Sequence, residues 1–212
     1  MIIKGLNDKR KLLEVIVLFF VLFFPQFQLT PANYPIAVIN HALLWRIPAL
    51  ILILLLLGKK QPFCPKKDIL TLAAVLPALV LTGFLVSFFA GLTGYVPSVE
   101  IVPPSGITGW IAVVLLSLST GFLEEGYFRC YLPERLLEQW PSRTPRAVVS
   151  AFAVSGLIFA LCHAYEGPWG TANAVLAACI LSFAYIKSSS FPGIALAHGL
   201  YNIFVYISAT LN

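Results

Sequence analysis

Charged residues are scarce in this sequence, and their scarcity excludes an ordinary soluble domain. Only 11% of the 212 residues are Asp, Glu, Lys or Arg, while 59% are hydrophobic. A soluble domain carries about 25% charged residues. Lys and Arg outnumber Asp and Glu by 14 to nine, but long apolar runs surround them. We therefore interpret the excess of +5 as a signal of membrane topology and expect no nucleic-acid partner.

Paired cysteines, a cleavage site and repeats are also absent. The four cysteines show no C-x-x-C spacing, which argues against a disulfide framework or a zinc knuckle, and we expect mostly buried thiols. No small-residue cleavage site follows the basic amino terminus, so we retain the first apolar run as a membrane span. We treat residues 1–212 as one membrane domain, in which 1–106 carry spans without motifs and 107–205 form the catalytic core.

The apolar runs predict an all-α fold, a polytopic bundle of about seven transmembrane helices. Each span needs about 20 mostly apolar residues. The predicted spans are residues 12–30, 36–57, 69–93, 107–132, 147–164, 170–187 and 191–211. Lys and Arg occur at the amino terminus and in every second loop, whereas loops 31–35, 94–106 and 165–169 contain none. Because cytoplasmic loops accumulate basic residues, we expect the amino terminus inside and the carboxyl terminus outside.

Two arginines lie inside apolar runs, where each needs a partner or a route to the interface. For Arg46 we expect extension to the interface or pairing with nearby His41, and no role in a site. Arg129 follows Glu125 by four residues. Since residues four apart on a helix are neighbours, these two can neutralise each other.

Glu124 and Glu125 are adjacent carboxylates within the fourth span. Ionised groups at that depth cost at least a few kcal/mol each, so both need a partner or a chemical role. Glu124 points about 100° away from Glu125 on a helix. We therefore expect Arg129 to form an ion pair with Glu125, while Glu124 has no such partner and is available to react. The alternative is an ion pair that only stabilises the helix, beside an interfacial glutamate.

Further polar groups lie in the fifth and seventh spans. His163 lies near the end of the fifth, while His198 and Asn202 are four apart and share one face of the seventh. The turn at 141–145 lies midway between Glu125 and His163. An antiparallel hairpin folded there brings the glutamates and His163 to one level, and the seventh span reaches that level if the hairpin extends about 14 Å into the cytoplasm.

These motifs resemble a known family. Glu124-Glu125-x-x-x-Arg129, Phe159-x-x-x-His163 and His198-x-x-x-Asn202 follow one another on separate apolar spans, as in the CPBP intramembrane proteases, which include CAAX prenyl endopeptidases and bacteriocin-processing or immunity proteins. The resemblance covers about residues 107–205. It implies an all-helical membrane peptidase in which Glu124 and His163 activate a water while His198 and Asn202 stabilise the oxyanion. Three further residues are expected to support these groups: Glu125, Arg129 and Phe159.

The polar residues of these spans suit more than one function. Peptide hydrolysis needs a base, a proton for the leaving amine and donors to the oxyanion, and these residue types supply all three. We expect no cofactor, but one carboxylate and two histidines also suit zinc, although no H-E-x-x-H occurs. The same residues are compatible with a proton-coupled transporter or a non-catalytic peptide-immunity protein. The expected partners are the lipid bilayer and a membrane-associated peptide or protein substrate, in a prokaryotic inner membrane.

Overall fold

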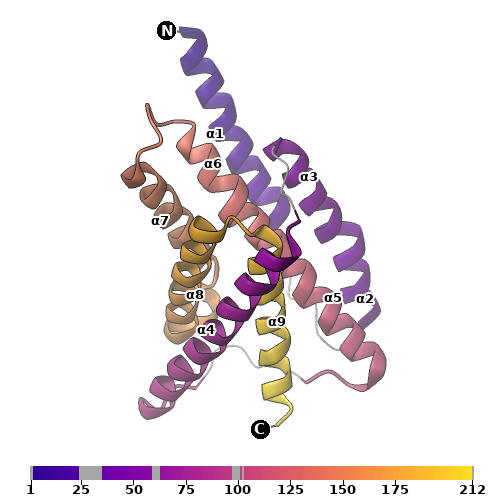
Figure 1. Ribbon diagram of the computed structural model, residues 1–212. Helices are drawn as coiled ribbons and strands as arrows, with labels where there is room; N and C mark the ends of the chain where they lie inside the picture. Colours follow the sequence, from indigo (N-terminus) through magenta and orange to yellow (C-terminus); the bar gives the residue numbers. More distant parts are fainter. Residues whose placement is uncertain (1, 24–34, 59–62, 97–100, 102, 212) are drawn as a thin grey trace.

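The computed structural model describes residues 2–23, 35–58, 63–96, 101 and 103–211, and regular structure within these ranges is helical throughout (Figure 1). The predicted all-α fold is confirmed. The elements are α1 (Ile2–Phe23), α2 (Pro35–His41), η2 (Ala42–Arg46), α3 (Ile47–Leu57), α4 (Pro65–Leu92), α5 (Gly106–Glu125), η3 (Gly126–Tyr131), α6 (Leu132–Leu137), α7 (Pro145–Cys162), η4 (Ala164–Glu166), α8 (Gly167–Ser188) and α9 (Phe191–Ala209).

Six helical segments of the described chain are long and apolar enough to cross a membrane, which supports an integral membrane protein. They are Pro35–Leu57, Pro65–Leu92, Gly106–Leu137, Pro145–Cys162, Ala164–Ser188 and Phe191–Ala209. Each corresponds to a predicted span. The remaining prediction, residues 12–30, combines the second half of α1 with residues outside the described ranges.

The central segment is a continuous helical run made of α5, η3 and α6, with α2 and α3 on one side and α7 and α8 on the other (Figure 1). Its 32 residues extend about 48 Å at 1.5 Å per residue. A bilayer core is about 30 Å thick. The run therefore exceeds the bilayer, in agreement with a hairpin that projects beyond it.

Two π-helical turns interrupt the α-helices, and a proline follows each one. Pro48 is the second residue of α3, directly after η2, and Pro133 is the second residue of α6, directly after η3. A proline inside a helix cannot donate to the preceding turn and clashes with its carbonyl. Wider π turns accommodate that loss and are frequent at functional sites. Each of these two turns carries an arginine, Arg46 in η2 and Arg129 in η3.

Close contact between α5 and α9 depends on two glycines. A Cβ atom built on Gly121 would lie 2.7 Å from the carbonyl oxygen of Ala195 and 2.7 Å from the amide nitrogen of Gly199. One built on Gly199 would lie 3.0 Å from the Cα of Leu118. Small residues allow membrane helices to approach this closely. The contact brings His198, the first residue of the third motif, close to Glu124 and Glu125 of the first motif.

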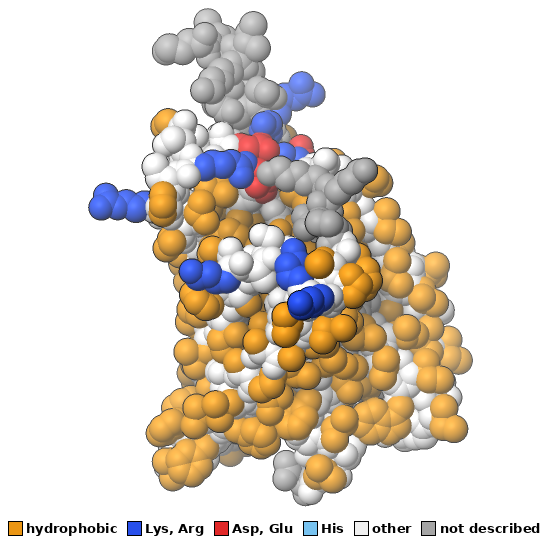
Figure 2. Space-filling model, in the orientation of Figure 1, with side chains coloured by type: hydrophobic (Ala, Val, Ile, Leu, Met, Phe, Trp, Pro, Cys, Tyr) orange, Lys and Arg blue, Asp and Glu red, His pale blue; other side chains and the backbone are white. Residues whose placement is uncertain are grey.

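Lys and Arg side chains are unevenly distributed over the face of the molecule that Figure 2 shows. On the face in Figure 2, Lys and Arg lie toward the end that carries the amino terminus, and apolar side chains cover most of the remainder. At this end Lys11 pairs with Glu138 at 2.8 Å, and Lys67 donates to the carbonyl of Ser189 at 3.3 Å. The basic loops thus share one side, as the charge pattern predicted. Their placement in the cytoplasm stays a prediction.

The expectation of mostly buried thiols is wrong for Cys179. All four cysteines are free, but Cys130 alone is buried, Cys162 is half-buried, and Cys64 and Cys179 are exposed. Cys179 is exposed on α8, a helix long and apolar enough to cross a membrane, so an apolar sequence context did not imply burial inside the protein.

Candidate active site

The paired glutamates lie at the junction between α5 and the π turn η3. Glu124 is 7% exposed and Glu125 is fully buried. Their side chains have different surroundings, as the helical geometry predicted. Glu125 contacts charged partners on two helices, whereas Glu124 lines a cavity.

Glu125 is held by two partners. Its Oε2 atom lies 3.2 Å from Nε of Arg129, and its Oε1 atom lies 2.8 Å from Nδ1 of His198. The predicted pairing of Glu125 with Arg129 is therefore present. The bond to His198 was not predicted, because the sequence alone does not show which face of α9 meets α5.

His198 lies between the two carboxylates. Because an ionised carboxylate only accepts hydrogen bonds, Nδ1 of His198 carries the proton toward Glu125. Its second ring nitrogen, Nε2, is 3.8 Å from Oε2 of Glu124. Glu125 thus fixes the orientation of the imidazole, so that Nε2 faces the side of Glu124.

His163 is the residue that ends α7, one position after the last helical residue, so it lies in the turn and not within the predicted helical span. Its Nδ1 atom is 2.8 Å from the carbonyl oxygen of Phe159. A carbonyl cannot donate, so Nδ1 carries a proton, and in the neutral ring Nε2 then keeps a lone pair. His163 can therefore accept a proton or orient a water at Nε2.

Phe159 packs at the centre of these groups. Its ring is 4.5 Å from the guanidinium carbon of Arg129 and 4.5 Å from the His163 ring, centroid to centroid. The His198 ring is 6.0 Å away, nearly perpendicular. One aromatic side chain thus contacts the cation that neutralises Glu125 and both histidines.

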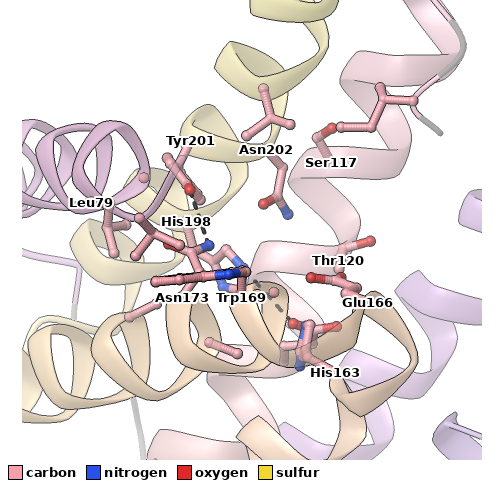
Figure 3. A pocket seen from close by; sticks show the side chains of 18 of the residues that line it. Leu79, Ser117, Thr120, His163, Glu166, Trp169, Asn173, His198, Tyr201 and Asn202 are labelled. Carbon is pink, nitrogen blue, oxygen red and sulfur yellow. Dashed lines mark hydrogen bonds and ion pairs between the residues drawn. The ribbon is translucent and has the colours of Figure 1, made fainter. Parts of the chain in front are cut away.

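The cavity beside Glu124 has a volume of about 690 Å³, a size typical of small-ligand sites. His163, His198 and Asn202 line it together with Glu124. In Figure 3, His198 and Asn202 extend from α9 toward the space that His163 faces. All four residues predicted to act in catalysis therefore border one cavity, although their roles stay predictions.

Sequence reasoning missed Arg46. It was expected to reach the interface or pair with His41, but it is 8% exposed and lines the same cavity as Glu124. Neither Nε of Arg46 nor Nε2 of His41 has a hydrogen-bond partner among the described residues. Pro48, two residues later, is the sequence signal that could have indicated a special backbone here.

Metal binding was the competing interpretation of this constellation. Within the described ranges, no group of three or more His, Cys, Asp or Glu side chains is arranged to hold a metal ion. The Nδ1 atoms of His163 and His198 are already directed at oxygens of the protein. Of this set, only the two Nε2 atoms and the Glu124 carboxylate would remain available as metal ligands.

Comparison with known protein families gives a match in the second half of the chain. Residues 106–204 match the model of a family described as type II CAAX prenyl endopeptidase, Rce1-like. These residues are therefore similar to that family over somewhat less than half of the chain. The match contains every residue of the three motifs and confirms the resemblance to CPBP proteases. The similarity supports a membrane protease. No curated protein and no solved structure matches the chain.

Proposed function

We propose that this protein hydrolyses a peptide bond of a membrane-associated substrate with a water that Glu124 and His163 activate. One observation carries the proposal: the two adjacent glutamates have separate surroundings. Arg129 and His198 engage Glu125, whereas Glu124 borders the cavity with His163 and Asn202. A general base needs access to water and to substrate, and Glu124 has the arrangement that meets this need.

The reaction balances with these groups alone. Glu124 takes one proton from a water that Nε2 of His163 orients, and the resulting hydroxide forms a bond to the carbonyl carbon. The carbonyl oxygen becomes an oxyanion that accepts hydrogen bonds from the Asn202 amide and from Nε2 of His198 when that nitrogen is protonated. When the C–N bond breaks, Glu124 returns its proton to the leaving amine.

The remaining motif residues position these groups. Glu125 holds Nδ1 of His198, and Arg129 neutralises Glu125. Phe159 supports Arg129 and both imidazoles through its ring and fixes the His163 tautomer through its carbonyl. Such supporting contacts hold reacting groups within the narrow geometry that catalysis requires.

Similarity to the family favours a substrate of the CAAX type, in which the bond lies close to the carboxyl terminus. The expected location is a prokaryotic inner membrane with the basic loops in the cytoplasm. Reporter fusions test this orientation. Fusions at 59–67 and 141–146 should report inside, and those at 94–106 and the carboxyl terminus outside; an outside reading at Lys66 would overturn it.

The test of the mechanism is cleavage of tagged candidate substrates by the purified protein, with mass spectrometry of the products. Glu124→Gln should lower the rate at least about 100-fold, because the amide cannot take a proton. Its thermal stability should match wild type. Glu138→Gln, an isosteric change at the protein surface, is the matched control and should keep the wild-type rate. Wild-type turnover by Glu124→Gln would refute the role of Glu124.

Chelation separates this mechanism from zinc catalysis. A metal-free enzyme keeps its activity after exhaustive chelation and contains no stoichiometric zinc. Loss of activity that zinc restores would move Glu124, His163 and His198 into ligand roles. Protein that cleaves no substrate, yet still protects cells from a secreted peptide, would favour a peptide-immunity function.

A further inference from the structure

Arg46 is a buried cation at the wall of the catalytic cavity. It is the last residue of the π turn η2 and is 8% exposed. The turn packs against α5, the helix that ends in the paired glutamates. Arg46 and Glu124 line the same cavity.

The guanidinium of Arg46 makes no close ion pair in the part of the chain that the structure describes, although the charge of Glu124 acts on it from beyond 4.0 Å. Its Nε and Nη1 atoms are buried and make no hydrogen bond. No described carboxylate lies within 4.0 Å of it, although Glu124 and Glu166 line the cavity. A buried arginine without a partner is costly. A bound carboxylate would offset this cost, because hydrogen bonds between a guanidinium and a carboxylate are strong and often bidentate.

We infer that Arg46 binds the carboxyl-terminal carboxylate of the substrate peptide while Glu124 acts on a bond a few residues upstream. A guanidinium presents paired N–H groups that match the two oxygens of a carboxylate. The inference rests on the proposed function, because it assigns a recognition site within the same cavity.

A chain terminus supplies the carboxylate that an internal segment lacks. A volume of about 690 Å³ holds a short peptide, and each extended residue advances only about 3.3 Å. A free chain end a few residues from a scissile bond at Glu124 can therefore lie beside Arg46, which lines the same cavity. An amidated or extended peptide would leave the Arg46 charge unpaired and add chain that the wall must accommodate.

The test uses three peptides of one sequence: the free acid, its carboxyl-terminal amide and a form extended by several residues. Wild-type kcat/KM should be at least about tenfold higher for the free acid, equivalent to about 1.4 kcal/mol. Arg46→Met should abolish this preference, because kcat/KM for the acid should fall to the level of the amide. Arg46→Lys should keep part of the preference, because its charge remains without the planar fork.

The control variant is Arg143→Met, which removes an arginine that pairs with Glu134 at the surface. It should keep the full preference for the acid. Thermal unfolding reports whether each variant is folded, and the wild-type ratio tests the inference even if Arg46→Met does not fold.

The outcomes distinguish this inference from the proposed function. Equal wild-type cleavage of acid and amide, abolished by Glu124→Gln, overturns the role of Arg46 and leaves the mechanism standing. A preference that persists in Arg46→Met overturns it as well. A uniform loss for both peptides in Arg46→Met also overturns it, since the arginine would then act on the catalytic groups. Cleavage that survives Glu124→Gln refutes the proposed function itself.

Discussion

Two groups of charged residues in this protein have similar composition and different burial. The buried cluster consists of Glu125, Arg129 and His198, and Glu125 and Arg129 are at most 1% exposed. The surface cluster consists of Lys11, Arg135 and Glu138, whose side chains are 16–34% exposed. Both contain ion pairs at 2.8–3.2 Å.

The difference teaches that distance alone does not set the importance of an ion pair. Water and salt screen the surface cluster, and each exposed pair contributes at most about 1 kcal/mol. The buried cluster cannot be solvated, so removal of one member strands a charge. The following predictions test whether burial separates the two clusters.

The largest effect is expected from breaking the buried pair. Glu125→Gln leaves Arg129 without its counter-charge and should lower the free energy of unfolding in detergent by about 3–5 kcal/mol. Arg129→Ala should do the same. Both variants should also lose activity, because His198 loses its fixed orientation.

The double variant Glu125→Gln/Arg129→Met sharpens this test. It removes both charges, so its stability should exceed that of either single change, as thermal unfolding would show. Equal inactivity of Glu124→Gln and Glu125→Gln, with unchanged stability in both, would contradict the division of roles between the two glutamates.

The next effect comes from separating α5 and α9 without altering a charge. Gly121→Ala places a methyl group 2.7 Å from backbone atoms that cannot yield, and should cost about 1–3 kcal/mol. The shift should separate His198 from Glu125 and lower kcat. Gly156→Ala is the matched control, since its Cβ would meet the Cβ of Ala178 at an ordinary 3.4 Å. Equal behaviour of the two variants would show that the close helix contact is dispensable.

A smaller effect is expected from the aromatic support of the cluster. Phe159→Leu removes the ring beneath Arg129, an interaction of about 2 kcal/mol when desolvated. The catalytic rate should fall as well, since His163 and His198 both lose their contact with the ring. Phe152→Leu, on the same helix and outside the cavity lining, should cost stability without a comparable loss of kcat. A similar loss of kcat in both would remove the special role of Phe159.

The sequence predicted much of this arrangement because membrane helices follow local rules. Hydropathy placed six described helices, and the four-residue spacing of Glu125 and Arg129 predicted their ion pair. Ordered motifs predicted which residues border the cavity. These inferences need only the chain order and helical periodicity.

Contacts that depend on how two helices pack were not predictable in the same way. The bond from His198 to Glu125 requires the close approach at Gly121, and the position of Arg46 requires the π turn before Pro48. Helical periodicity gives the face of a residue on its own helix. It does not give the rotation of one helix against another, which packing decides.

The smallest effect is expected in the surface cluster, where it should depend on pH. Partial burial raises the pKa of Glu138, but the hydrogen bond from Lys11 and the charges of Arg135 and Lys11 outweigh it, so the pKa lies below its ordinary value. The carboxylate therefore stabilises the fold at pH values above about 4.3, the unfolded pKa, and this contribution is lost as the pH falls through the folded pKa. Glu138→Gln should lower the free energy of unfolding at pH 7 by at most about 1 kcal/mol, and 1 M salt should reduce the difference. At pH 3 the variant and wild type should unfold with a smaller difference than at pH 7. A penalty that persisted at pH 3 and in high salt would mean that this cluster acts through packing, as the buried cluster does, and the comparison between the two would fail.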